Sequence, residues 1–155
     1  MRAIFLGVAL LCTAAFWGCR QMDVYEHNTT IPHYEWKQGF AANGNFDISD
    51  TVSAYNIYIV LRHTDAYHYN NIWLNVGIQP PADSIRFQKV DLSLGSDAGG
   101  WEGTGINDIW EVRKPLALNK RFIKMGTYQF SIYHIMREEP LQWVMSAGLR
   151  LEKVK

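Results

Sequence analysis

Short runs rich in Val, Ile, Tyr, Phe and Trp recur along the chain, and residues that favour turns separate them. The segments between the runs carry Gly, Pro, Ser and Asp, as in QPPAD at 79–83. Runs of this length and composition at near-regular spacing are typical of β-strands. The runs occupy residues 45–49, 55–64, 71–79, 84–94, 109–118, 127–136 and 143–154.

Two of these runs alternate apolar and polar residues in the way of a half-buried strand. No segment keeps apolar residues at helical spacing over three turns. The sequence therefore predicts an all-β fold, a single antiparallel β-sandwich that is jelly-roll-like. The residues expected to face its core are Tyr128, Phe130, Ile132 and His134 in one run and Ala147, Leu149 and Leu151 in the other.

The amino terminus has the pattern of a bacterial lipoprotein signal. Arg2 precedes an apolar stretch from 3 to 17, which is too short to span a bilayer comfortably and ends beside Gly18 and Cys19. Cleavage before Cys19 would leave it as the mature chain's one cysteine, available for acylation. A plain signal peptide or an uncleaved anchor with an incidental cysteine is the alternative.

Three regions follow from this interpretation. Residues 1–18 are the signal peptide, 19–35 are the lipidated N-terminus and a tether that joins an edge strand, and 36–155 are the β-sandwich domain. Two or more acyl chains on Cys19 would anchor the chain stably to a membrane, since one chain alone binds marginally.

Charge excludes one class of partner. The chain has 15 basic and 15 acidic residues, and loss of Arg2 with the signal peptide leaves 14 and 15. The basic residues are scattered, whereas nucleic-acid binding needs a positive face, so no nucleic-acid partner is expected. The tryptophans are expected to fill the core, although rings such as Trp101 or Trp110 could instead form a platform for a sugar or peptide.

The polar segment LRHTDAYHYNNIWL at 61–74 has several side chains that could bind a metal or a partner, and it is the main candidate site. His63, Asp65 and His68 could be metal ligands, but the chain has no H-E-x-x-H or CxxC motif, and strand-end hydrogen bonding is the favoured alternative. Within a hairpin corner, Arg62 would pair with or stack on Tyr67 or Tyr69. Asn71 would hydrogen-bond to the backbone of the turn.

Catalytic motifs are missing elsewhere. The chain has no G-x-S-x-G motif of a serine hydrolase. Its acidic residues show no spacing that marks the carboxylate pair of a glycosidase. The glycine-rich stretch 95–105 lacks the Gly-Lys-Ser/Thr ending of a phosphate-binding loop. Its glycines are therefore expected to supply the positive φ angles of an irregular loop. A calcium ion at Asp97 and Glu102 is the weaker alternative. We therefore expect no metal, no cofactor and no enzymatic activity.

Several of these segments together resemble the gliding-motility lipoprotein GldH family of Bacteroidetes, over almost the whole chain. The spacing of Arg62, Tyr67, Tyr69 and Asn71 is the most distinctive feature. The family often has Pro at the position of His68, which weakens the metal hypothesis. The segments that carry the resemblance are the lipoprotein start at Cys19, the opening Ile31-Pro32 with Trp36, and residues 46–50, 55–74, 99–105 and 126–153. Phe16 and Trp17 depart from the family pattern, because the usual motif has Leu and a small residue at these two positions before Gly18.

The resemblance implies a cell-envelope lipoprotein that acts with gliding and with type IX secretion, in a family that has no established catalytic activity. The implied partners are the membrane, through the lipid anchor, and envelope proteins, for which Arg62, His63, Tyr67, Tyr69 and Asn71 are either a contact or a structural corner. Surface-export signals in these bacteria place acidic residues soon after the lipidated cysteine. Here the acids Asp23 and Glu26 are sparse and follow Arg20, which favours a periplasm-facing domain. An envelope carbohydrate- or peptide-binding module is the second hypothesis.

Overall fold

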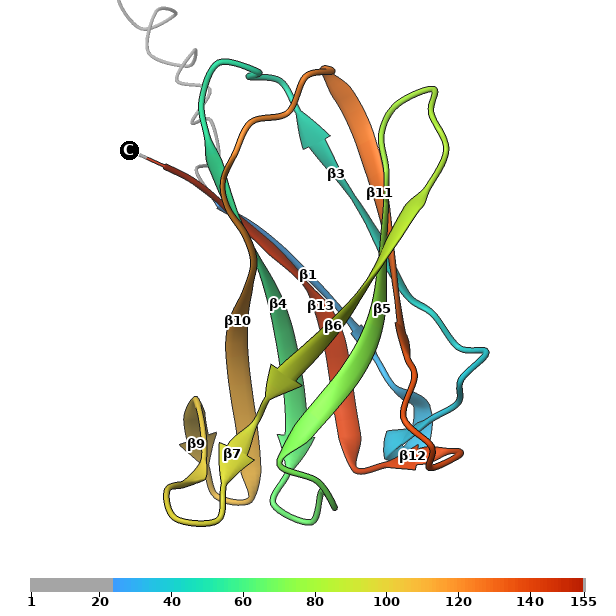
Figure 1. Cartoon of the computed structure of the whole chain (residues 1–155), viewed down its shortest axis with the longest axis vertical. Helices are drawn as coiled ribbons and strands as arrows, with labels where there is room; N and C mark the ends of the chain where they lie inside the picture. The colour runs from blue at the N-terminus through green and yellow to red at the C-terminus, as the bar shows by residue number, and fades with distance from the viewer. Residues whose placement is uncertain (1–23, 155) are drawn as a thin grey trace, which may run out of the picture.

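The structure, a computed structural model, describes residues 24–154, which form two antiparallel sheets that face each other (Figure 1). The larger sheet has the strand order β1 (Val24–Thr30), β13 (Val144–Lys153), β4 (Tyr55–Thr64), β10 (Ile109–Lys120) and β9 (Thr104–Ile106). The smaller sheet has the order β3 (Ala42–Ile48), β11 (Gly126–His134), β5 (Asn71–Gln79) and β6 (Arg86–Ser93).

Short paired segments close the ends of the sandwich. β2 (Glu35–Trp36) pairs with β12 (Leu141–Gln142), and β7 (Gly95–Ser96) pairs with β8 (Gly100–Trp101). A 3-10 turn, η2 (Pro32–Tyr34), precedes β2. Within residues 24–154, no helix has the length and apolar character needed to cross a membrane.

The predicted all-β sandwich is confirmed, and each predicted run overlaps a strand. β4 and β5 have the predicted bounds, because turn residues mark both of their ends. The predicted core faces are also confirmed, since alternate residues from 128 to 134 and from 147 to 151 are buried. Gly148 is buried too, because β1 lies directly against it.

β1 lies inside the range 19–35 that the sequence analysis assigned to the N-terminus and tether. It pairs with β13 along its whole length, from Val24 opposite Glu152 to Thr30 opposite Ser146. β1 is the edge strand expected there, but it belongs to the sandwich, so the described part of the domain begins at Val24 rather than at residue 36. A polar edge strand has little apolar pattern, and therefore its extent is hard to see in the sequence.

Aromatic rings fill the core at both ends of the sandwich. At one end Phe46 stacks on Tyr128 with ring centroids 5.4 Å apart, and Phe122 packs edge-on against Tyr128 at 4.9 Å. At the other end the fully buried Trp36 lies 5.5 Å from the ring of His134 and donates its indole N–H to the Phe40 carbonyl at 2.8 Å. Offset and edge-on ring pairs of this kind add to the burial of apolar area.

Candidate functional site

The segment 61–74 forms the corner between β4 and β5, and its two key rings are buried. His63 Nδ1 lies 2.8 Å from the Thr64 carbonyl, and its ring packs against Trp101 at 4.6 Å and Tyr67 at 5.5 Å. The Tyr67 hydroxyl donates to the Asn71 carbonyl at 3.0 Å. Burial lowers the pKa of His63, so the imidazole is neutral near pH 7. The rings of His63, Tyr67 and Trp101 therefore form an uncharged cluster at this end of the sandwich.

The outer part of the corner is polar. The ring of Tyr69 lies 5.8 Å from that of Tyr67 and is partly exposed. His68 Nδ1 lies 3.1 Å from a Glu138 carboxylate oxygen. The Asn71 side-chain amide donates to Asp91 at 2.8 Å, so it binds β6 rather than the backbone of the turn as predicted.

Arg62 does not reach Tyr67 or Tyr69, because successive side chains of a strand point to opposite faces. His63 points inward, and Arg62 lies on the outer face of the larger sheet, where its guanidinium is 2.7 Å from Glu111. The predicted pairing of Arg62 with the corner tyrosines is therefore wrong.

The three residues considered as metal ligands have separate partners. His63 is inside the corner, His68 is bound to Glu138, and the backbone N–H of Asp65 donates to the Asp108 carbonyl at 2.8 Å. Across residues 24–154, no group of three or more His, Cys, Asp or Glu side chains is placed to hold a metal ion.

The glycine-rich stretch 95–105 forms the β7–β8 hairpin and the approach to β9. Gly100 and Gly103 have φ of +70° and +92°, so the prediction that its glycines adopt positive φ is confirmed at both positions. The Glu102 carboxylate binds Lys114 and accepts a hydrogen bond from Ser93 at 2.6 Å. Both carboxylate oxygens of Glu102 therefore have partners within the protein.

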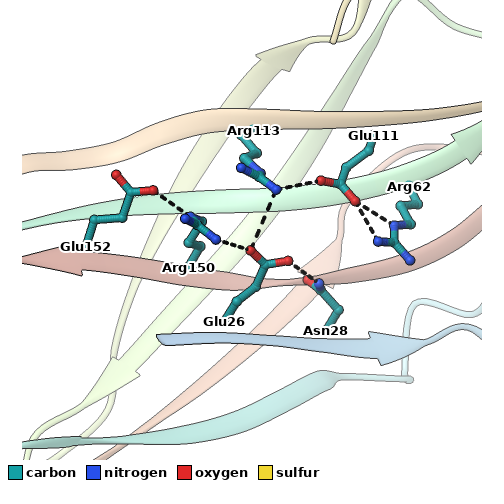
Figure 2. Close-up of polar contacts among 7 residues, drawn as sticks. All are labelled: Glu26, Asn28, Arg62, Glu111, Arg113, Arg150 and Glu152. Atoms are coloured by element: carbon teal, nitrogen blue, oxygen red, sulfur yellow. Dashed lines mark hydrogen bonds and ion pairs between the residues drawn. The ribbon is translucent and has the colours of Figure 1, made fainter. Parts of the chain in front are cut away.

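Ionic side chains cross the outer face of the larger sheet (Figure 2). Glu26 on β1 accepts from Arg150 on β13 at 2.8 Å and lies 4.0 Å from Arg113 on β10. Arg113 donates to Glu111 at 3.0 Å, and Glu111 also binds Arg62 on β4. We define this set of alternating charges as the outer ionic network: Glu26, Arg62, Glu111, Arg113, Arg150 and Glu152.

The outer ionic network satisfies its own charges. Burial alone would raise the pKa of Glu26, but hydrogen bonds from Arg150 and Asn28 and the charge of Arg113 lower it. Three carboxylates face three guanidiniums, so the face is neutral and joins four strands. Val60 has the same strand parity as Arg62 and is nevertheless buried, and Arg113 lies opposite it on β10.

The outer face of the smaller sheet is different, because large rings on it remain exposed. Phe87 on β6 lies over Gly77 of β5, and its ring centroid is 6.2 Å from that of Tyr133 on β11. Trp73 on β5 lies on the same face and is 43% exposed. We define Trp73, Phe87 and Tyr133 as the aromatic face.

The aromatic face was missed in the sequence, although alternation around Trp73 carries a signal for it. Ile72 and Leu74 are buried, so Trp73 must point outward. Trp101 and Trp110, the two rings considered from the sequence as a binding platform, lie elsewhere. Trp101 packs on the corner cluster, and Trp110 lies over Gly105, so these two half-buried rings do not form a common platform.

Cys19, the predicted lipid-attachment residue, lies outside the described residues. It remains a prediction from the sequence.

Comparisons with known proteins place the chain in a family. A family model described as GldH lipoprotein matches residues 23–151. The chain is 26% identical over 161 residues to the gliding motility lipoprotein GldH homolog of Christiangramia forsetii, with 99% of this chain and 98% of that protein covered. It is 23% identical over 160 residues to the gliding motility lipoprotein GldH of Flavobacterium johnsoniae, with 99% of each chain covered.

Among solved structures, the crystal structure of the infectious bursal disease virus VP2 subviral particle matches 83% of this chain and 32% of that chain, with a TM-score of 0.34 and 14% identity. A likeness at this level does not extend to function. The family model spans most of the chain and both relatives align along almost all of it; the chain belongs to the GldH lipoprotein family.

Proposed function

We propose that this chain is a non-enzymatic lipoprotein of the cell envelope, acylated at Cys19, whose β-sandwich binds proteins of the gliding or type IX secretion machinery. Two relatives that align along nearly their full length are named gliding motility lipoproteins. Membrane attachment through a lipid requires no contribution from the folded domain, which is then left to bind partners.

The observation that carries the interaction part is the contrast between the two outer sheet faces. The outer ionic network is neutral and internally paired, whereas the aromatic face leaves Trp73 and Phe87 about half exposed. Ile85 and Ile135 beside it are also exposed. Exposed aromatic residues with a polar surround are enriched at protein interfaces, which supports a protein partner for this face.

Several carboxylates of the described residues are held ionised by partners within the fold. Hydrogen bonds or neighbouring cations outweigh burial and lower their pKa, which is the pattern of structural ion pairs. The groups concerned are Glu26, Asp50, Asp83, Glu102 and Glu138.

The anchor is tested by metabolic labelling with a radioactive fatty acid. The wild type and a Cys12→Ala variant should incorporate label into the mature protein, whereas Cys19→Ala should not. Equal labelling of the Cys19→Ala variant would show that the lipid is not on this cysteine. Surface proteolysis of intact cells then tests the periplasm-facing orientation, which predicts protection of the domain.

The interaction is tested by affinity capture of the lipoprotein from detergent-solubilised envelope, followed by mass spectrometry. Trp73→Ala should lose the partner proteins that the wild type retains. Trp143→Ala is the matched control, because Trp143 is similarly exposed (39%) and lies at the end of the sandwich, outside the aromatic face. Capture of the same partners by all three proteins would contradict a role for the aromatic face.

The second candidate is a carbohydrate- or peptide-binding module, and the exposure of Trp73 and Phe87 on one sheet, with the half-buried Tyr133 beside Phe87, favours it. The polar side chain of Asn75 lies between these rings in the strand register, as in a face that binds sugar hydroxyls. Binding of envelope polysaccharide by the wild type but not by Trp73→Ala in affinity electrophoresis would favour this candidate over a protein partner.

A further inference from the structure

Exposed apolar side chains gather at one end of the sandwich. Val52 lies in the loop between β3 and β4, and Ile123 and Met125 lie in the loop between β10 and β11. A single exposed apolar residue is ordinary, but several in two adjacent loops mark a binding surface. We define them with Leu118 as the loop rim; their exposed fractions are 81% for Val52, 57% for Leu118, 89% for Ile123 and 67% for Met125.

The two loops run side by side from one sheet to the other. Ile48, before the first loop, pairs with Gly126, after the second. Tyr55, after the first loop, pairs with Lys120, before the second. Figure 1 shows both loops at the upper end of the molecule.

Internal hydrogen bonds fix the first loop with Val52 outward. The Asp50 carboxylate accepts the backbone N–H groups of Val52 at 2.8 Å and Ser53 at 3.0 Å. Lys153 at the end of β13 lies 2.7 Å from the same carboxylate. The exposure of Val52 is therefore a property of a well-bonded turn.

The second loop is fixed in the same way. Phe122 is buried in the core, and the Tyr128 hydroxyl donates to the Lys124 carbonyl at 3.0 Å. Lys124 also lies 3.2 Å from Asp83 in the neighbouring β5–β6 loop. Ile123 stands between these two anchored residues and points into solvent.

Basic residues accompany the apolar ones. Lys120 and Arg121 are exposed beside the rim, and the half-buried Lys124 and Lys153 lie nearby. The carboxylates of Asp50 and Asp83 each bind one of these lysines. An apolar surface with a basic surround is the composition of proteins that lie in the interface of an anionic membrane.

The same end of the sandwich carries the start of β1. Val24 pairs with Glu152, which immediately precedes Lys153. Cys19 is only five residues before Val24, and five extended residues span at most about 18 Å. An acyl group on Cys19 would therefore keep Val24, at the same end of the sandwich as the loop rim, within about this distance of the bilayer surface.

We propose that the loop rim docks on the membrane that holds the lipid anchor, with Val52, Ile123 and Met125 in the interfacial region and Lys120 and Arg121 against anionic headgroups. This inference rests on the proposed acylation of Cys19. Docking orients the sandwich with its β1 start toward the lipid and its opposite end, with the 61–74 corner, away from it. It leaves both outer sheet faces open to partners.

The test uses the mature lipoprotein in vesicles of phosphatidylcholine and phosphatidylglycerol that contain brominated lipid. In the mature lipoprotein the sulfur of Cys19 is a thioether to the lipid and does not react with maleimide. An environment-sensitive maleimide fluorophore therefore labels only a single introduced cysteine. Ile123→Cys and Val52→Cys report the rim. Ile106→Cys is the matched control, because Ile106 is 71% exposed and lies at the opposite end, paired with Ile109.

The fluorophore at 123 or 52 should be quenched several-fold more strongly by brominated lipid than at 106. Combining Ile123→Cys with Lys120→Gln and Arg121→Gln should reduce the quenching on anionic vesicles. Equal, weak quenching at 123 and 106 in protein that floats with the vesicles would overturn the docking alone. Protein that fails to float and whose Cys19 reacts with maleimide would overturn the anchor, and docking with it.

Discussion

Gly148 on β13 lies opposite Asn28 on β1, so close to that strand that one added methyl group should damage the fold. A Cβ there would collide with the His27 carbonyl oxygen and the Asn28 side chain, and it would lie 2.7 Å from Asn28 Cα. Two of these obstacles are backbone atoms of the paired strand. Gly148→Ala therefore forces β1 away from β13.

The expected loss of stability follows from this geometry. Overpacking typically costs about 1–3 kcal/mol, and the upper end applies here because backbone must move. Displacement of β1 also disturbs the contacts of Tyr25 with Phe46 and of His27 with Phe130, whose ring centroids lie 5.9 and 6.2 Å apart. A loss of about 3 kcal/mol would lower the melting temperature by roughly 6–12 °C for a domain of this size.

Thermal unfolding followed by circular dichroism measures the effect, and hydrogen exchange of the β1 amides locates it. Gly39→Ala is the matched control, since a Cβ there meets no atom within 4 Å. That change should be neutral or should stabilise the fold by about 0.4–1 kcal/mol. Equal melting temperatures for Gly148→Ala and the wild type, with β1 amides equally protected, would refute the assignment of β1 to the sandwich.

Further changes test the corner, the buried histidines and the ionic network. Burial lowers the pKa of His63 and His134 in the folded chain, so the unfolded chain binds more protons below about pH 6.5 and stability falls toward pH 5, by at most about 1.4 kcal/mol per pH unit for each histidine. Urea unfolding should show this slope, and His63→Phe should reduce it; an unchanged slope would contradict the burial of the imidazole. Tyr67→Phe leaves the Asn71 carbonyl without its partner and should cost about 1 kcal/mol in urea unfolding, so an unaltered midpoint would count against that hydrogen bond. Glu26→Gln should cost less than about 1 kcal/mol, with the loss shrinking at high salt, and a salt-independent loss would show that the network acts through packing instead.

The strands of the core could be predicted because their composition and alternation are local properties. β4 and β5 are bounded by turn residues on both sides, and Tyr128 and Phe130 alternate with polar neighbours. The two-residue pairs β7–β8 and β2–β12 could not be predicted, since so short a segment has no period.

The candidate site depends on contacts between distant segments, and this limits what the sequence can predict. The period of two places Arg62 and His63 on opposite faces of β4, so alternation alone separates Arg62 from Tyr67, whose ring packs against His63. The partner of Arg62 on β10 requires the strand register, as does the approach of Phe87 to Tyr133.

The intact mass of the mature protein extracted from the envelope tests the central claim most directly. A lipid-anchored sandwich predicts a chain that begins at Cys19 and carries the added mass of its acyl chains, and a Cys19→Ala variant that lacks this form. An unmodified chain, or one that retains residues 1–18, would contradict the account.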